Sequence, residues 1–308
     1  MTMKKNETSD ITITVYEVHC RQESVEKPKL SISLFRALNS TNSIRDRLMP
    51  LSKTNDNKDH DFIANFISSP HSLFGSFARL REGEESVVQK TILDKKIASL
   101  NEMVSASAKN SEGFIRSSSF FCVYNSLLAI TNAHANIRAF ETYINWLLKQ
   151  QEDSNYMYRF IPKKNTATTI SIGEIKSIQL ADTFINAESN ITRTQMFNLK
   201  TNILKTFFKD IKSVSDFNEE DIISATLTLK FNKKKLQKEK ALDTALKIID
   251  SEDIIINGKN GKRIRGSEFL VKAIRKIEKS GKNLYNELQI EKEMHDILKR
   301  VENNEVVL

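Results

Sequence analysis

The chain is poor in the residues that mark loops, metal sites and disulfide frameworks. Its 308 residues include eight glycines, four prolines and two cysteines, Cys20 and Cys122. So few glycines and prolines exclude a low-complexity or loop-dominated chain. Two cysteines at no metal-ligand spacing exclude a disulfide scaffold and a zinc site, and they favour a reducing compartment.

Long hydrophobic runs are also missing. No stretch approaches the roughly 18 consecutive apolar residues of a membrane span. The opening segment MTMKKNETSD has basic residues but lacks the apolar run of a secretory signal. We therefore expect a cytoplasmic protein. The 39% hydrophobic content is enough for a real core, and the length allows one large domain or two ordinary ones.

Hydrophobic periodicity predicts interspersed strands and helices without regular βαβ alternation. Strands are expected at 11–20, 73–81, 156–162, 170–180 and 222–231, and hairpins within 113–131 and 254–265. Helices are expected at 136–150, 194–213, 236–250, 266–279 and 284–302, and 30–49 suits a helix or two short turns. The pattern indicates an α+β fold with mixed or antiparallel sheets and flanking helices. The first half is strand-rich, and the second half is basic and richer in helix.

The polar segment 151–155 is a candidate boundary between two regions, 1–152 and 153–308, although one interleaved fold is also open. Within the last predicted helix, apolar residues recur at roughly heptad spacing. Core packing is the default interpretation of such a stripe, and a dimer seam is the alternative. A third possibility makes the helix a docking surface for a phage or host protein.

Positive charge is concentrated late in the chain. The formal net charge is +8, while residues 228–282 alone hold 16 Lys and Arg against 7 Asp and Glu, a net of +9. Such a basic zone is typical of proteins that bind polyanions, because each neutralised phosphate releases condensed counterions. The alternative is a solvated lysine-rich face balanced by nearby carboxylates.

Motifs of the common enzyme classes are absent. The chain has no Gly-x-Gly-x-x-Gly or Gly-Lys-Ser/Thr phosphate loop, no Gly-x-Ser-x-Gly elbow and no HExxH metal motif. We expect no cofactor, no metal and no small-molecule substrate. One weak pattern remains: Glu174 and Lys176 share a face of a predicted strand, and with Asp153 they could hold a divalent metal for phosphodiester cleavage. A surface ion pair explains the same pattern.

The non-catalytic alternative uses more of the sequence. Lysines and arginines at the ends of predicted elements can reach phosphates without reading bases, and sparse aromatics among them favour duplex over single-stranded DNA. The candidate contacts are Arg159, Lys163, Lys164, Lys230, Lys233, Lys234, Lys235, Lys238, Lys262, Arg263 and Arg265.

Three segments resemble the RexA-like phage exclusion family. They are TLTLKFNKKKLQKEKALDTALKIID at 226–250, INGKNGKRIRGSEFL at 256–270 and KPKLSISLFRALN at 27–39. The resemblance covers about half the chain. It implies a homodimeric α+β protein that binds duplex DNA without strong sequence preference. It also implies a role in prophage-encoded exclusion of other phages (abortive infection), with a membrane protein as candidate partner.

The family offers no catalytic residues to carry over. For DNA contact, the resemblance matches the basic stretch after the strand, Lys233, Lys234, Lys235 and Lys238, whereas Lys262, Arg263 and Arg265 match by charge only. The leading hypothesis is therefore a sequence-nonspecific, double-stranded-DNA-binding homodimer of prophage or host antiviral defence. A metal-dependent nuclease and a protein-interaction module are the alternatives.

Overall fold

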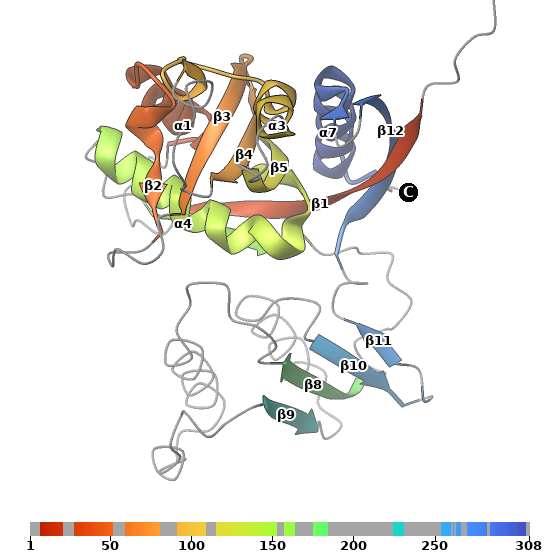
Figure 1. Cartoon of the computed structure of the whole chain (residues 1–308). Coiled ribbons are helices and arrows are strands. Elements are labelled where there is room, and N and C mark those ends of the chain that lie inside the picture. The colour runs from red at the N-terminus through yellow and green to blue at the C-terminus, as the bar shows by residue number, and fades with distance from the viewer. Residues whose placement is uncertain are drawn as a thin grey trace, which may run out of the picture. The chain divides into compact units, whose positions relative to one another are not determined.

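The chain divides into two compact units in a computed structural model (Figure 1). The structure describes residues 7–20, 28–51, 59–80, 91–108, 115–152, 157–163, 175–183, 224–230, 254–259, 261, 263–265, 270–281 and 284–305. The core unit comprises 1–163 and 271–308, and the inserted unit comprises 164–270. These bounds differ from the division at residue 152, because the end of the chain returns to the first unit.

The chain leaves and re-enters the core unit at a single place. Lys163 N donates to Val15 O at 3.0 Å, Val271 N donates to Lys163 O at 2.9 Å, and Val15 N donates to Val271 O at 3.0 Å. Three backbone hydrogen bonds thus join Lys163, where the chain leaves the core unit, Val271, where it returns, and Val15 of the first strand. The inserted unit is consequently a loop-like insertion whose ends are already joined in the core unit.

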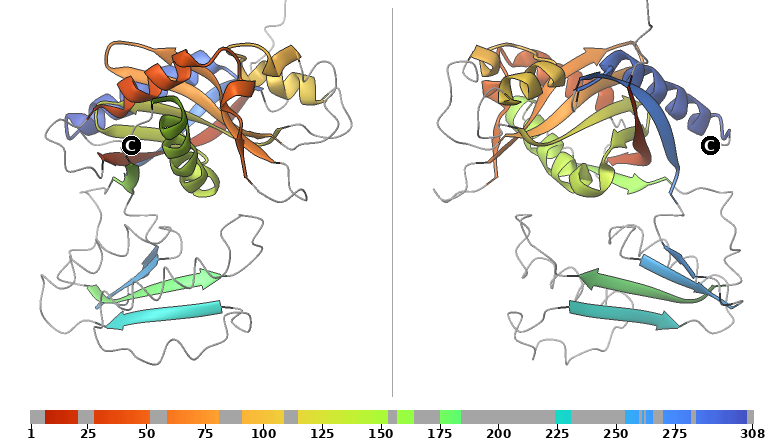
Figure 2. Two further views of the ribbon diagram at one scale, coloured as in Figure 1. Left: turned by 90° about the vertical axis from the view of Figure 1, so that its left-hand side faces the viewer. Right: turned by 45° about the vertical axis from the view of Figure 1, so that its right-hand side comes forward.

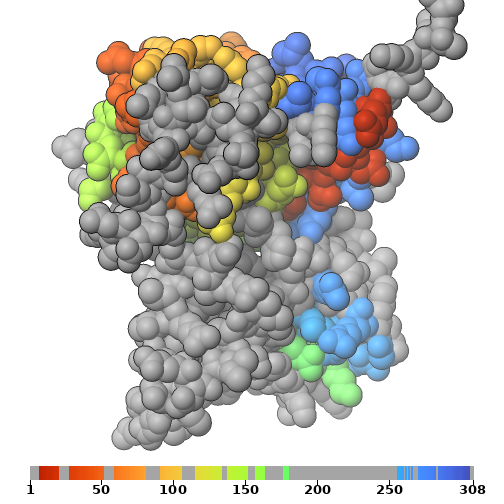
Figure 3. All heavy atoms as spheres, viewed as in Figure 1, coloured from red at the N-terminus to blue at the C-terminus, as the bar shows by residue number. Residues whose placement is uncertain are grey.

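The core unit is built on a nine-stranded sheet with the order β13-β12-β1-β6-β5-β4-β3-β2, and β7 also pairs with β1. Its strands are β1 (Thr8–Cys20), β2 (Met49–Pro50), β3 (His60–Ser68), β4 (Ser72–Leu80), β5 (Ile115–Tyr124), β6 (Leu127–Thr131), β7 (Tyr158–Pro162), β12 (Lys272–Gly281) and β13 (Leu284–Tyr285). All neighbours pair antiparallel. Strand β1 is long enough to pair with β12, β6 and β7, so strands from the first and last parts of the chain lie in one sheet. In Figure 3 the red atoms of the N-terminal part accordingly lie beside blue atoms of the C-terminal part.

Helices cover both faces of this sheet: α1 (Leu30–Ser40), α3 (Leu100–Ala108), α4 (Ala133–Glu152) and α7 (Glu287–Glu302), with a short 3₁₀ turn at Arg45–Arg47 (Figure 2). From α4, Phe140 packs against Phe77 and Phe121 on one face. From α7, His295 meets the ring of Tyr124 on the opposite face. Because alternate residues of β5 point to opposite faces, these two helices sandwich the strand.

Helix α7 resolves the alternatives for its apolar stripe. Asn286 caps its start by accepting from Gln289 N at 3.1 Å, and Asn304 follows its end with φ of 57°. Its buried residues are Ile290, Met294, Ile297, Leu298 and Val301, which belong to the core of the unit. The stripe therefore packs inside the chain, as the core interpretation predicts, and only Leu288 among its apolar residues is largely exposed.

The prediction of a helix at 266–279 is wrong where the structure describes that segment, because it forms strand β12. Val271, Ile274 and Ile277 are spaced like one face of a helix, and the segment is rich in helix-forming residues. In the strand, Ala273 and Ile277 are buried, whereas Ile274 is 63% exposed. Pairing with β1 across seven residues outweighs the local preference.

The α+β prediction is confirmed, and so are most strand predictions and the helices α4 and α7. Among the described elements longer than three residues, β3 and α3 were not predicted. A bulge between Ile63 and Asn65 breaks the alternation of β3, which hides its period from the sequence. The predicted helices 194–213 and 236–250 lie outside the described residues. Within the described part of the chain, no helix is long and apolar enough to cross a membrane.

A buried arginine donates hydrogen bonds to the bulged edge of β3. Arg47 is fully buried, and its guanidinium donates to Ile63 O at 2.6 Å, Ala64 O at 3.2 Å and Lys96 O at 2.7 Å. A fourth bond reaches Thr41 Oγ1 at 3.0 Å. Ile63 and Ala64 lie at the bulged edge of β3, where Ala64 O also accepts from Ala98 N at 3.1 Å. The guanidinium and Ala98 together thus provide the donors that a neighbouring strand would provide.

Candidate nucleic-acid interface

The described part of the inserted unit is a four-stranded antiparallel sheet. Its strands are β8 (Ile175–Thr183), β9 (Ser224–Lys230), β10 (Ile254–Gly258) and β11 (Arg263–Arg265), in the order β11-β10-β8-β9. The turn between β10 and β11 is closed by Gly261 N donating to Gly258 O at 3.2 Å, and Gly261 has φ of 79°. Glycine allows this left-handed conformation, which confirms the predicted hairpin.

The register aligns the polar positions of all four strands in rows. One row runs Arg263, Asn257, Ser177, Lys230, and the next runs Arg265, Ile255, Gln179, Thr228. Further along β8 and β9, Ala181 pairs with Thr226 and Thr183 with Ser224. Directly paired positions share a face of the sheet, and so do positions two apart along a strand. We call the face defined by these rows the polar face.

Most of the opposite positions are apolar. Ile256 pairs with Ile178, and both side chains are fully buried. Positions Ile264, Leu180, Leu227 and Leu229 complete the same register rows, and the same face also holds position 176, which is an exposed lysine, and position 182, which is an aspartate. The sheet thus has one mainly apolar and one mainly polar face, and we take the polar face as the candidate binding side.

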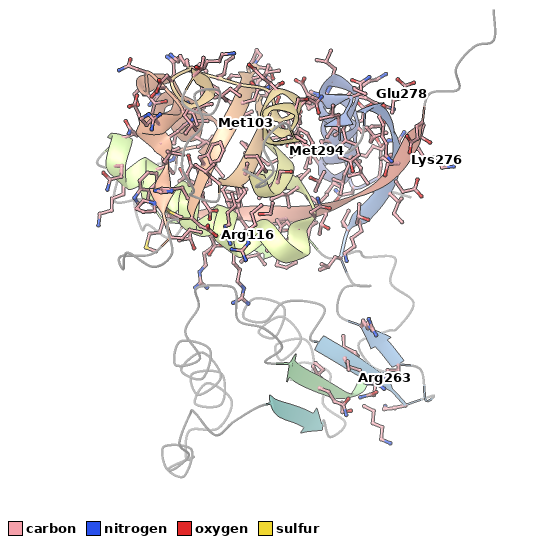
Figure 4. The ribbon with its side chains drawn as sticks, in the orientation of Figure 1. Met103, Arg116, Arg263, Lys276, Glu278 and Met294 are labelled. Carbon is pink, nitrogen blue, oxygen red and sulfur yellow. The ribbon has the colours of Figure 1, made fainter. Side chains whose placement is uncertain are left out.

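Charge and exposure on the polar face favour an anion. Arg263 and Arg265 are exposed, as is Lys259 in the adjoining turn (Figure 4 labels Arg263). Asn257 is partly exposed and donates from Nδ2 to Ser177 Oγ at 3.2 Å. The described positions assigned to the polar face are arginine, lysine, amide, hydroxyl and apolar residues.

The structure brings together only some of the predicted contact residues. Lys230, Arg263 and Arg265 occupy one face of the inserted sheet. Arg159 is exposed on β7, which belongs to the core unit. The remaining candidates Lys164, Lys233, Lys234, Lys235, Lys238 and Lys262 lie outside the described residues.

Lys163 is engaged within the core unit. Its Nζ lies 2.7 Å from Glu17 Oε1, and His19 bonds the other oxygen of the same carboxylate at 3.2 Å. Partial burial raises the pKa of Glu17, but the bonds from Lys163 and His19 outweigh that effect and hold the pKa below its ordinary value. The lysine is therefore partnered by a carboxylate rather than presented to a polyanion.

Cations of the segment predicted as a helix are also partnered, now on β12. Arg275 Nε lies 3.0 Å from Glu293 Oε2, and Lys279 Nζ lies 3.0 Å from Glu7 Oε1. Both contacts join β12 to other parts of the core unit. This portion of the +9 window thus contributes to intramolecular ion pairs, as the alternative interpretation of a lysine-rich segment predicts.

The residues of the nuclease alternative are only partly described. Lys176 is exposed on β8, whereas Glu174 and Asp153 lie outside the described residues. In the ranges that the structure covers, no group of three or more His, Cys, Asp or Glu side chains is placed to hold a metal ion. Burial raises the pKa of Cys122 to about 12, so this thiol stays protonated and behaves as a core residue.

Sequence reasoning missed the neutral part of the polar face. Ser177 and Gln179 of β8 and Asn257 of β10 carry no charge, and about 80 residues of sequence separate the two strands, so no local motif joins all three. The alternation within each strand was visible, but the order of the strands was not. Searches of family models, curated proteins and solved structures found no match to this chain.

Proposed function

We propose that the protein binds double-stranded DNA without sequence preference through the polar face of the inserted sheet. The observation that carries the proposal is the composition of that face: two exposed arginines and a lysine position, joined by amide and hydroxyl residues. Arginine, serine, threonine, asparagine and glutamine are the side chains that most often bond phosphate and sugar oxygens.

Electrostatics supports the same choice of ligand. Each phosphate neutralised by a cation releases counterions, which gives sequence-independent affinity that falls steeply with salt. The hairpin Ile254–Arg265 carries two exposed arginines and exposed Lys259 within a few residues of each other. A duplex offers closely spaced phosphates to such a cluster, whereas the sparse aromatics provide little stacking for single strands.

The biological role is proposed from the RexA-like segments. In that role, a cytoplasmic homodimer would bind DNA during prophage or host antiviral defence and exclude other phages, with a membrane protein as a partner. The RexA-like segments 226–250 and 256–270 overlap β9, β10 and β11, so they overlap the strands that carry the polar face.

Fluorescence anisotropy on two unrelated 30-base-pair duplexes tests the DNA-binding proposal. The variant R263E/R265E reverses both exposed arginines, and K149E/K292E reverses two exposed lysines of α4 and α7 as a charge-matched control. We expect comparable wild-type affinity for both duplexes, a loss of about 100-fold in the arginine variant and a loss of less than about threefold in the control. Absent wild-type binding, or equal losses in both variants, would overturn the proposal.

A further inference from the structure

We infer that the outer edge of β12 is a strand-pairing surface for a second copy of the chain, and that side chains of β12 and α7 block it in the folded protein. The inference does not depend on the proposed DNA binding. Strand β12 pairs with β1 from Lys272 to Glu278, whereas β13 reaches its other side only at Lys279 and Gly281. Among the described residues, most of the outer edge thus lacks a neighbouring strand, and such an edge is a template for another chain.

The direction of the backbone groups alternates along β12. Val271 O accepts from Val15 N at 3.0 Å, so the odd-numbered residues direct their backbone groups towards β1. In an antiparallel strand, the N–H and the C=O of one residue point to the same side, and the next residue points to the other side. The outer edge is therefore formed by the backbone groups of Ile274, Lys276 and Glu278.

Gln289 of α7 bonds this edge as a neighbouring strand would. Its Oε1 accepts from Glu278 N at 2.9 Å, and its Nε2 donates to Lys276 O at 3.2 Å. Figure 4 labels both of these β12 residues. One carboxamide thus offers an acceptor and a donor to two successive outward residues, which is what the peptide groups of a paired strand provide. A second chain would have to displace this amide.

Arg275 occupies the next carbonyl along the edge. Its Nη1 donates to Ile274 O at 3.0 Å, while its Nε lies 3.0 Å from Glu293 Oε2. Gln289 and Glu293 are four residues apart, so they lie on one side of α7, the helix beside β12 in Figure 1. We call the contacts of Gln289 and Arg275 with the outer edge the edge caps. Helix α7 supplies one cap directly and positions the arginine that supplies the other.

Charge on β12 also opposes pairing with a second copy. Two copies would pair antiparallel about a two-fold axis, which fixes the residues that face each other. A pair centred on position 275 sets Arg275 opposite itself, and a pair centred on position 274 sets Lys272 opposite Lys276 twice. Like charges directly opposite each other destabilise a strand pair, and charged side chains are a common protection of exposed edges.

The register centred on position 275 also indicates why the partner is a second copy. It sets Ile274 opposite Lys276 twice, and the outward N–H groups of both residues have no partner among the described residues. Their carbonyls are those that the edge caps occupy. Without the caps, each of these residue pairs can exchange both backbone hydrogen bonds. The loss of Arg275 also removes the central repulsion, and Lys272 then faces Glu278 at both ends of the pair.

Sedimentation velocity of the full-length protein over a range of concentrations tests the inference. R275A/Q289A removes both edge caps, and R275A and Q289A remove one each. R45A/Q150A removes an exposed ion pair and an exposed amide of the core unit as a matched control. A triple variant adds I274P, because proline at this position removes an outward N–H and leaves the bonds to β1. Far-ultraviolet circular dichroism checks folding; K276P replaces I274P if that variant unfolds, and the single variants decide if R275A/Q289A unfolds.

We expect R275A/Q289A to self-associate at least about tenfold more strongly than wild type, the single variants to lie between them, and the control to match wild type. Addition of I274P should return the association to the wild-type level. The inference is overturned if removal of the caps does not increase association, if the control associates as strongly, or if I274P does not reduce the association. It is also overturned if I274P alone weakens association of the wild type, because the edge would then already be paired.

Discussion

Replacing Arg47 should destabilise the core unit more than any surface substitution. The guanidinium is fully buried, and its described hydrogen bonds go to three carbonyls and one hydroxyl rather than to a carboxylate. Burial lowers the pKa of Arg47 from its ordinary value to about 10, so holding the charge in the folded chain reduces its stability. The substitution Arg47→Met keeps the length of the side chain and removes both the donors and the charge.

The magnitude follows from two opposing effects. Ile63 O and Lys96 O lose their donor at about 2 kcal/mol each, whereas Ala64 O keeps a bond from Ala98 N and the Thr41 hydroxyl keeps its bond to Leu38 O, so these two lose about 1 kcal/mol each. The four contacts thus amount to about 6 kcal/mol. Removing the desolvated charge returns about 3 kcal/mol, as the lowered pKa implies at neutral pH. The net loss is therefore about 3 kcal/mol, a large part of the stability of an ordinary domain.

Urea unfolding measures this loss. Trp146 lies in α4, with its ring 5.8 Å from that of Tyr143, so its fluorescence reports on the core unit. Arg45→Met is the control, because the contact of Arg45 with Asp94 is exposed and should contribute less than about 1 kcal/mol. If the free energy of unfolding of Arg47→Met lies within about 1 kcal/mol of the wild-type value, the hydrogen bonds of Arg47 do not stabilise the edge of β3 as described.

Two further predictions concern the core unit. Burial raises the pKa of Asp61 more than its hydrogen bonds from Arg79 lower it, so the folded chain takes up this proton at a higher pH than the unfolded chain. Wild type therefore gains stability as pH falls through that pKa. We expect the free energy of unfolding of Asp61→Asn to be about 3 kcal/mol below that of wild type at pH 7, and urea titrations should show this difference widening towards pH 4. A difference that narrows contradicts this prediction. Excision of 164–270 with a linker of about three residues should leave a folded core unit, because Lys163 and Val271 are already hydrogen-bonded. Circular dichroism and Trp146 fluorescence check the fold, anisotropy should show the loss of duplex binding, and an unfolded product would refute the independence of the core unit.

Local pattern was sufficient where one face of an element is buried along its whole length. The sequence predicted β1 from its alternation and α4 from its apolar stripe, because burial follows the period of the element. In α4, for example, Phe140 and Ile144 are fully buried. The same rule failed for β12, where the 271/274/277 spacing imitates a helix. It also failed for β3, because Asp61 is buried in an ion pair with Arg79 and the bulge at Ala64 shifts the period.

The candidate site was predicted in part. Charge counting pointed to the segment that contains Arg263 and Arg265, since a cluster of cations is visible in one dimension. The same counting included Lys163, Arg275 and Lys279, which the fold pairs with distant carboxylates. Whether a lysine meets a carboxylate far along the chain depends on the course of the backbone, and no local pattern records it.

By itself the sequence determined the α+β class, most of the elements, the basic second half and the absence of the common catalytic motifs. Only the tertiary structure decided that the last strand and helix rejoin the first unit, that a buried arginine closes β3, and which cations share a face. The physical reason is that periodicity and charge are local properties of the chain, whereas strand order, register and ion pairing arise from contacts between residues of different elements, from 18 positions apart for Arg275 and Glu293 to 272 for Lys279 and Glu7.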